Sequence, residues 1–277
     1  MIFYTVFGCL ADVIFDYLKI DSKTYRRLSV ISKEFPVDVL EKHRRISLFR
    51  LHKVPYIFKK LDVFCNIKTD QLNELLQIQV EKLNISFAPI NNDTIRLLTY
   101  MKLKKLDISK TIIPSESLYF SMLTVTSLIL TKCSGITRNT IITISTLHLK
   151  KLKLSKCSYL TDYDIDPIEN CKCLKHLEVM DCYNITDNCK LFTLQLEYLD
   201  IYQCHKISDK SLLFSKELKV LIIGYIPNIT YRGLCTLKKL PRLEYVSITG
   251  LYINNEHLIK VRKELDIKVD IFEVYEI

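Results

Sequence analysis

The sequence LKKLKLSKC, residues 149–157, decides the fold of this chain. Its leucines follow the spacing L-x-x-L-x-L, and a cysteine stands three residues after the last of them. The same nine-residue template fits the stretches that begin at residues 125, 174 and 196 and end at Cys133, Cys182 and Cys204. Self-similarity at a nearly fixed period is the sequence signature of a repeat architecture.

The template continues in both directions with other residues in the cysteine position. Units begin at residues 58, 80, 103, 125, 149, 174, 196, 218 and 243, so that neighbouring starts are 22 to 25 residues apart. This spacing is in the range of leucine-rich repeats. Because strand side chains alternate between two faces, the apolar residues of L-x-L point into a core, and the residues beside them point to the opposite face.

A turn and a helix start follow each strand motif. Steps such as Leu160-Thr161-Asp162 and Ile185-Thr186-Asp187 place a hydroxyl and a carboxylate where either can cap the first turn of a helix. Each repeat is therefore predicted to be a strand, a turn and a helix, and stacked repeats bury one continuous core. We predict an α/β solenoid, curved as a horseshoe, with about nine parallel strands on its concave face.

The cysteine at the end of the strand motif, with an Ile-Thr-Asp step after it, resembles the cysteine-containing leucine-rich repeats of the F-box/LRR family over roughly residues 58–265. The segment before the repeats resembles an F-box. Its apolar residues have the spacing of an amphipathic helix, and a second helix should begin after Ser22. Ala11 replaces the usual proline, and Phe35 replaces the usual tryptophan.

The resemblance implies a three-helix F-box-like cap over residues 1–45, a solenoid over 46–265 and a C-terminal cap over 266–277. It also implies a substrate receptor of an SCF-type cullin–RING ubiquitin ligase, in which the F-box binds the cullin-ligase adaptor protein and the concave face holds an unknown target protein. The adaptor contacts would correspond to Leu10, Val13, Ile14, Leu18 and Leu28.

No sequence signature of an enzyme is present: there is no Gly-rich phosphate loop, no H-E-x-x-H and no G-x-S-x-G. Cys133, Cys157, Cys182 and Cys204 should form a column with about 5 Å between neighbours, whereas four zinc ligands must converge on one point. We therefore predict buried free thiols, with no metal, cofactor or catalytic residue. Ten sparse cysteines favour a reducing compartment, the cytoplasm or the nucleus.

The concave positions change character along the chain. Those that follow the starts at 103, 125 and 149 are polar and mostly basic, whereas those after 174 include aromatic and aliphatic residues. Exposed groups of that kind are typical of protein interfaces. We predict that a partner protein is bound by Met180, Tyr198, Tyr202, Ile222, Tyr225 and Tyr245. The alternative is that Ile271, Phe272 and Tyr275 of a C-terminal tail cover these side chains.

Two other functions are compatible with the sequence. The first alternative is a stand-alone repeat scaffold of a cell or a virus that binds a partner without ubiquitination. A net charge of +9, with Lys82, Lys105, Lys151 and Lys153 at concave positions, could instead suit nucleic acid. We disfavour this function because phosphate recognition prefers arginine and interleaved aromatic residues. The sequence contains no run of about 20 uncharged apolar residues, so no membrane span is predicted.

Overall fold

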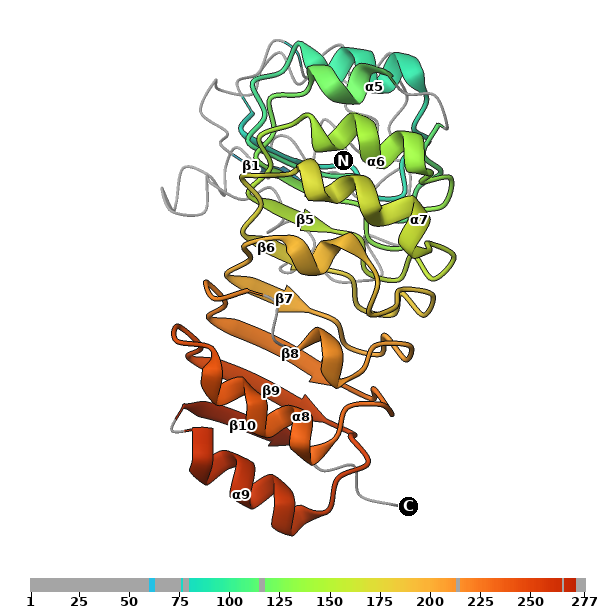
Figure 1. Ribbon diagram of the computed structural model, residues 1–277. Helices are drawn as coiled ribbons and strands as arrows, with labels where there is room; N and C mark the ends of the chain where they lie inside the picture. Colours follow the sequence, from blue (N-terminus) through green and yellow to red (C-terminus); the bar gives the residue numbers. More distant parts are fainter. Residues whose placement is uncertain are drawn as a thin grey trace, which may run out of the picture.

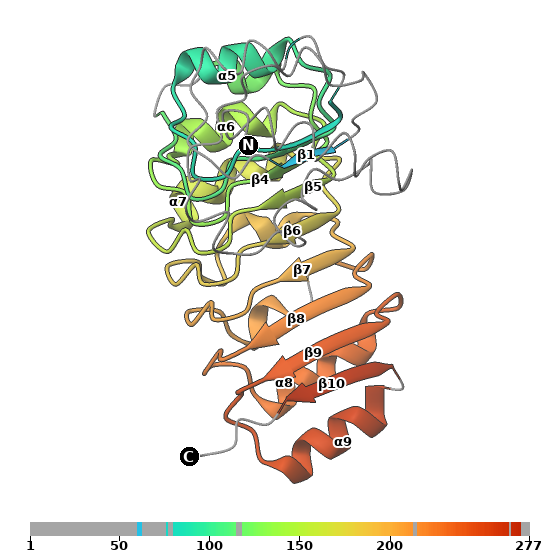
Figure 2. The ribbon, with the colours of Figure 1, turned by 180° about the vertical axis from the view of Figure 1, so that it is seen from behind.

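The computed structural model describes residues 60–62, 76, 80–114, 118–212, 215–265 and 267–272. The F-box-like segment, with Leu10, Val13, Ile14, Leu18 and Leu28, lies outside these ranges, as does Tyr275. Within them the chain forms a solenoid, with one parallel sheet on one side and the helical segments on the other (Figures 1 and 2). No helix in the described ranges is long and apolar enough to cross a membrane.

Ten strands pair in chain order, each parallel to its neighbours. They are β1 (Lys60–Asp62), β2 (Lys82–Asn84), β3 (Lys105–Asp107), β4 (Ser127–Ile129), β5 (Lys151–Lys153), β6 (His176–Glu178), β7 (Tyr198–Asp200), β8 (Val220–Gly224), β9 (Tyr245–Thr249) and β10 (Lys268–Phe272). The register places the same template position of every repeat side by side, so Leu128 pairs with Leu152 and Leu177 with Leu199. These four leucines are fully buried, which confirms the predicted inward positions of L-x-L.

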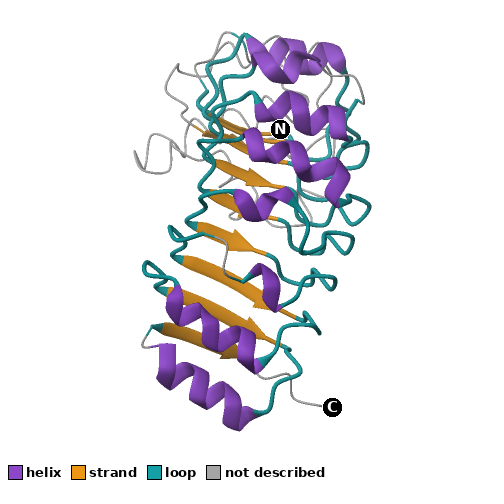
Figure 3. Cartoon of the chain, viewed as in Figure 1, coloured by secondary structure: helices purple, strands orange, loops and turns teal. Residues whose placement is uncertain are grey.

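The helical side contains both α-helices and 3-10 helices, and Figure 3 draws the helices in purple on one side of the orange strands. The α-helices are α5 (Asn92–Thr99), α6 (Arg138–Ser145), α7 (Asp162–Ile165), α8 (Tyr231–Thr236) and α9 (Asn255–Leu265). The 3-10 helices are η4 (Leu118–Met122), η5 (Asp166–Asn170), η6 (Lys190–Thr193), η7 (Asp209–Ser211) and η8 (Leu237–Lys239).

Repeat length explains which repeats carry only a 3-10 helix, a distinction that the prediction of a short helix in each repeat did not make. The units that begin at residues 103, 174 and 196 have 22 residues and carry only η4, η6 and η7. A 3-10 helix rises about 2.0 Å per residue, against 1.5 Å for an α-helix, so it spans the same distance with fewer residues. Units of 23 to 25 residues have room for an α-helical turn.

A tight turn ends each strand. The residue two positions after the second inward apolar residue has a positive φ between 49° and 66°, although seven of these eight residues are not glycine. They are Phe87, Lys110, Lys132, Lys156, Asp181, Gln203, Tyr225 and Gly250. In the first seven, the backbone N–H donates to a carbonyl of the next repeat, as Lys132 does to Ser155 at 2.8 Å. This turn therefore extends the ladder of the sheet by one hydrogen bond per repeat.

The cysteine column is a second tie between repeats. Each thiol donates to a main-chain carbonyl of the preceding repeat: Cys133 to Ile108 and Cys204 to Val179, both at 3.2 Å, and Cys157 to Leu130 and Cys182 to Leu154, both at 3.4 Å. All four are buried, and burial raises the pKa of each thiol, in Cys157 and Cys204 to about 12. The column thus serves packing and hydrogen bonding.

The recurrent aspartates of the turns have a different role from the predicted helix cap. Asp162 accepts hydrogen bonds from the backbone N–H and the hydroxyl of Thr186 in the next repeat, at 2.8 and 2.5 Å. Asp187 binds Ser208 in the same way, and Asp209 binds Thr230. The hydroxyl residue itself can cap its own helix, as Thr137 and Thr230 do. The aspartates therefore join consecutive repeats.

The predicted C-terminal cap, residues 266–277, contains a tenth strand in its described part. β10 pairs with β9 in register, Val269 beside Val246 and Ile271 beside Ile248. Its backbone thus continues the sheet and does not cross the concave face. The L-x-L positions are Val269 and Ile271, but the first position of the template is Asp266, so a search for three apolar residues misses this unit.

Candidate functional site

The concave face is the surface of the sheet that points away from the helical side. It consists of three columns of side chains. In each repeat they come from the residue before the first inward residue, the residue between the two inward residues, and the residue after the second. Lys151, Lys153 and Ser155 are the three in the repeat of β5, and Tyr198, Asp200 and Tyr202 are those in the repeat of β7. Neighbours in a column belong to adjacent strands, about 4.8 Å apart.

The first part of this face, from β2 to β5, is rich in lysine and is called the lysine half. Lys105, Lys151 and Lys153 are half-buried there, and the turn residues Lys110, Lys132 and Lys156 are exposed. Several of these charges already have partners. Lys151 and Lys153 lie 3.3 and 2.5 Å from Glu178 on β6, and Lys156 lies 3.9 Å from Asp181.

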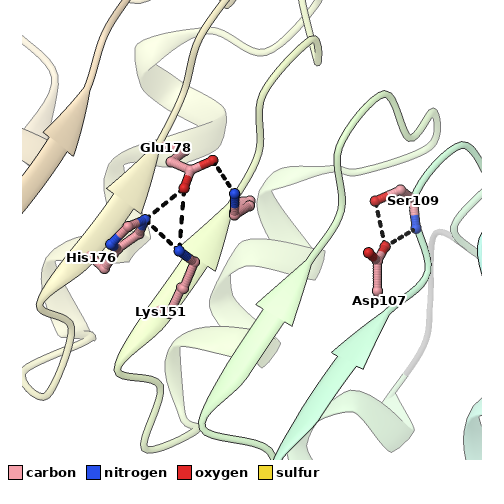
Figure 4. Close-up of polar contacts among 6 residues, drawn as sticks. Asp107, Ser109, Lys151, His176 and Glu178 are labelled. Atoms are coloured by element: carbon pink, nitrogen blue, oxygen red, sulfur yellow. Dashed lines mark hydrogen bonds and ion pairs between the residues drawn. The ribbon is translucent and has the colours of Figure 1, made fainter. Parts of the chain in front are cut away.

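A network around Glu178 forms the boundary of the lysine half (Figure 4). His176 Nε2 lies 2.6 Å from Glu178 Oε1 and 2.7 Å from Lys151 Nζ. One ring nitrogen cannot donate to the carboxylate and accept from the ammonium at once, so we assign the proton to Nε2, which donates to Glu178. Burial alone would raise the pKa of Glu178, but hydrogen bonds from His176 and Lys153 outweigh it and lower this pKa to about 2.

The second column contains a repeated turn in which a side-chain oxygen accepts the backbone N–H two residues later. Asp107 Oδ1 accepts from the N–H and hydroxyl of Ser109, at 3.1 and 2.6 Å (Figure 4). Asn84 Oδ1 makes the same two contacts with Ser86, and Asp200 Oδ1 accepts the N–H of Tyr202 at 3.0 Å. Asn and Asp are thus interchangeable in this turn, and its geometry needs no negative charge.

The tyrosine half of the concave face comprises the repeats of β6 to β9. The structure places all six predicted partner-binding residues here: Met180, Tyr198, Tyr202, Ile222, Tyr225 and Tyr245 are all half-buried. Tyr198 and Tyr245 lie on either side of Val220 in the first column, and Tyr202 follows β7 in the third. Strand alternation placed five of these residues on the concave face, and Tyr225 follows in the turn after β8.

The tyrosine rings are held by contacts within the protein. Tyr198 stacks on His176 with ring centroids 3.8 Å apart and an angle of 8° between the planes. Tyr202 contacts Tyr225 edge to face at 5.4 Å. Two glycines provide space: a Cβ atom would lie 2.7 Å from the Tyr202 ring at Gly224, and 2.6 Å from the Tyr225 ring at Gly250. Rings ordered in this way lose little conformational entropy when a partner binds.

Asp200 lies within this aromatic surface. Tyr198 and Tyr202 are its neighbours along the strand, and Ile222 is its neighbour on β8. Burial raises the pKa of Asp200 to about 6, and the nearby Glu178 carboxylate adds to the increase. Asp200, His176 and Glu178 occupy alternating concave positions, but none of them is among the predicted site residues. An acid between two tyrosines at alternate positions was the available signal for Asp200.

Other side-chain clusters offer less. No group of three or more His, Cys, Asp or Glu residues in the described ranges could hold a metal ion. The described cysteines are all free thiols, and Cys173 is exposed. Tyr245 is hydrogen-bonded through its hydroxyl to Asp270 of β10, at 2.7 Å, so the last strand supports the edge of the tyrosine half.

The sequence matches no family model and no curated protein. The structure is similar to internalin C2 of Listeria monocytogenes, with a TM-score of 0.55, 20% identity and coverage of 75% of this chain and 84% of that one. Internalin F of the same bacterium gives a TM-score of 0.55, 16% identity and coverage of 78% and 67%. TLR13, solved as a complex with ssRNA13, gives a TM-score of 0.52 and 18% identity, with coverage of 79% of this chain and 37% of that one. By its fold, the described part of this chain is a leucine-rich-repeat solenoid.

Proposed function

We propose that this protein is a non-enzymatic protein-interaction module, which binds a partner protein on the tyrosine half of its concave face. The observation that carries the proposal is a group of half-buried tyrosines, Tyr198, Tyr202, Tyr225 and Tyr245, whose rings are ordered in advance. Tyrosine is enriched among the residues that dominate binding energy at interfaces. β10 extends the sheet beside β9, so its backbone leaves this surface open.

The polar groups nearby support a role in binding. His176, Glu178, Lys151 and Lys153 satisfy one another, and this fixes the boundary of the surface. A general base or nucleophile needs a reactive group that is held ready for a substrate. Here the imidazole is stacked on a tyrosine and hydrogen-bonded to a carboxylate. Free thiols in the solenoid favour a cytoplasmic or nuclear location.

For the N-terminal segment we propose the finer role implied by the resemblance. The F-box-like helices would bind the adaptor of a cullin–RING ubiquitin ligase through Leu10, Val13, Ile14, Leu18 and Leu28, and the solenoid would present the target. Replacing both Val13 and Ile14 with Asp should abolish binding of the purified adaptor while the far-ultraviolet circular dichroism of the solenoid is retained. If the wild-type chain does not bind the adaptor, the protein is a scaffold without a ubiquitin role.

Binding of nucleic acid is the weaker alternative. TLR13, one of the similar structures, was solved with ssRNA13, and the lysine half could in principle attract phosphates. However, Lys151, Lys153 and Lys156 are each within 4 Å of a carboxylate, and Glu178 lowers the positive potential at the middle of the face. A fluorescence anisotropy titration with a 13-nucleotide RNA, repeated at two salt concentrations, tests this alternative directly.

The decisive experiment uses the double variant Tyr198→Ala, Tyr202→Ala. A partner is first identified by crosslinking to the wild-type chain, and the purified partner is then titrated calorimetrically. The double variant should lose on the order of 2 kcal/mol of binding free energy, about thirtyfold in Kd. The matched control is Tyr100→Ala, Tyr252→Ala, which removes two tyrosines that are 70% and 87% exposed outside the concave columns. Equal losses in both double variants would contradict the proposal.

A further inference from the structure

Asp200 differs in its contacts from nearby carboxylates of the concave face, two in the tyrosine half and one on the adjoining strand β10. Glu178 has two lysines and a histidine, Asp181 has Lys156 at 3.9 Å, and Asp270 has Lys268 at 3.9 Å. In the part of the chain that the structure describes, no lysine, arginine or histidine lies within 4 Å of the Asp200 carboxylate. Its one hydrogen bond joins Oδ1 to the N–H of Tyr202, which leaves Oδ2 available.

The surroundings of Asp200 make its negative charge costly. The side chain is half-buried between two tyrosines, and Ile222 faces it from β8. The charged groups that face it come from β5 and from the repeat of β6: Lys153, Glu178 and Asp181. Two of these three are acidic, and burial is the main reason why the pKa of Asp200 is raised to about 6. A poorly solvated carboxylate at neutral pH gains most from a cation that arrives with a partner.

The aromatic neighbours narrow the choice of cation. A guanidinium group is planar, stacks on aromatic rings and can donate to a carboxylate oxygen at the same time. An ammonium group is more strongly hydrated, and it loses more on transfer to a half-buried surface. Tyr198 and Tyr202 lie on either side of Asp200, each two residues and therefore about 6.6 Å away from it along the chain. A guanidinium bound to the Asp200 carboxylate can therefore lie against one of the two rings.

We propose that Asp200, together with Tyr198 and Tyr202, forms a binding site for an arginine side chain of the partner protein. The guanidinium donates to Asp200 Oδ2 and lies against one of the two tyrosine rings. The site rests on the proposed function, because it assigns part of the tyrosine half to one chemical group of the partner. It also defines the polarity of the contact: the partner carries a positive charge here, even though the chain itself has a net charge of +9.

The turn at Asp200 supplies a clean variant and a matched control. Asn84 makes this turn with its amide oxygen, at 3.0 Å from the N–H of Ser86, so Asp200→Asn should keep the hydrogen bond to Tyr202 and remove only the charge. Asp107→Asn is the same change at the same column position in the lysine half. The two variants therefore remove the same charge at the same turn position, with tyrosines on either side of Asp200 and with Lys105 and Ser109 on either side of Asp107.

The test uses a fluorescein-labelled hexa-arginine peptide and the full-length protein, with fluorescence anisotropy at pH 7.5. Because the chain has a net positive charge, nonspecific electrostatic repulsion opposes the binding of a cationic peptide. We expect saturable binding to the wild type, at least fivefold weaker binding to Asp200→Asn, and a change below twofold for Asp107→Asn. A hexa-lysine peptide should bind at least threefold more weakly than hexa-arginine.

Three results would overturn the inference: no hexa-arginine binding by the wild type, equal affinities of the wild type and Asp200→Asn, or hexa-lysine binding as tight as hexa-arginine. These outcomes are separate from failure of the proposed function. If Tyr198→Ala, Tyr202→Ala loses the protein partner while Asp200→Asn binds hexa-arginine normally, the tyrosine half remains the interface and the arginine site is wrong. If the tyrosine double variant keeps full partner affinity, the proposed function fails first.

Discussion

The lysine half and the tyrosine half of the concave face have the same backbone and different side chains. In both, parallel strands pair in register, a residue with positive φ ends each strand, and a buried cysteine donates to the preceding repeat. The lysine half presents flexible charged side chains, whereas the tyrosine half presents rings held in place by stacking and by glycines. The inward positions therefore determine the fold, and the concave positions are free to determine the partner.

The two halves also differ in how their repeats are joined at the turns. Asp162 joins the last repeat of the lysine half to the tyrosine half, and Asp187 and Asp209 join repeats within the tyrosine half. Each aspartate binds the hydroxyl residue of the next repeat. In the first half, Arg138 occupies the position of these aspartates, and Thr161 donates instead to Asp164 of its own repeat, at 3.0 Å. Among the described turns, the carboxylate joint is therefore found at and within the tyrosine half, whereas Arg138 contacts the next repeat through the carbonyl and the ring of Tyr163.

The largest expected effect comes from breaking one of these joints. Asp187 accepts three hydrogen bonds from the next repeat, from the N–H and hydroxyl of Ser208 and the hydroxyl of Ser211. Asp187→Ala should lower the free energy of unfolding by about 3 kcal/mol, because the donors of Ser208 and of the buried Ser211 lose a charged acceptor. Arg138→Ala, the equivalent change in the first half, should cost less than about 1 kcal/mol. Urea denaturation followed by circular dichroism measures both, and similar costs would contradict the difference between the halves.

A smaller effect is expected at the boundary between the halves. The pKa of Glu178 in the folded protein is about 2, below its ordinary value, so its stabilisation is present above about pH 4.5 and is lost as pH falls towards 2. Glu178→Gln should cost about 2 kcal/mol at pH 7 and make the stability less sensitive to pH between 5 and 2. The control is Glu256→Gln, which removes an exposed ion pair with Lys260 and should leave the unfolding midpoint unchanged. An unaltered pH profile in Glu178→Gln would disprove the role of the network.

The smallest effect has the opposite sign and lies one strand further on. The pKa of Asp200 in the folded protein is about 6, above its ordinary value, so its contribution to stability is fully present below about pH 3.8 and is lost as pH rises through 6. Asp200→Asn should therefore increase stability at pH 7.5 by about 1 kcal/mol, with the difference vanishing near pH 3.5. Thermal unfolding at the two pH values measures this. Destabilisation at pH 7.5 would mean that the charge is already compensated within the chain.

The sequence predicted the repeat fold well because its evidence is local. Each L-x-L pair indicates within its own three residues which side chains are buried, and Leu152 and Leu199 are buried as expected. The prediction missed the unit that lacks one template residue, β10, and it did not distinguish the 3-10 helices of the shorter repeats, such as η6, from α-helices. Alternation along a strand likewise identified Tyr198 and Tyr202 as members of the concave face.

The network at the boundary could not be predicted in the same way. His176 and Lys151 are 25 residues apart, and their contact depends on the register that the intervening helical segments impose. The joint between Asp187 and Ser208 has the same character, because the aspartate looks locally like a helix cap. Contacts between repeats need the stacking geometry as well as the sequence pattern.

The in-register ladder has a consequence for how such a chain can change. The units that begin at residues 174 and 196 are both 22 residues long, and each makes equivalent hydrogen bonds to its neighbours. Exchange, duplication or loss of a whole unit by recombination would preserve the inward leucines while it moves a complete set of three concave side chains to a new place. The triplets His176, Glu178, Met180 and Tyr198, Asp200, Tyr202 could therefore change their order along the concave face while the fold of the solenoid is kept.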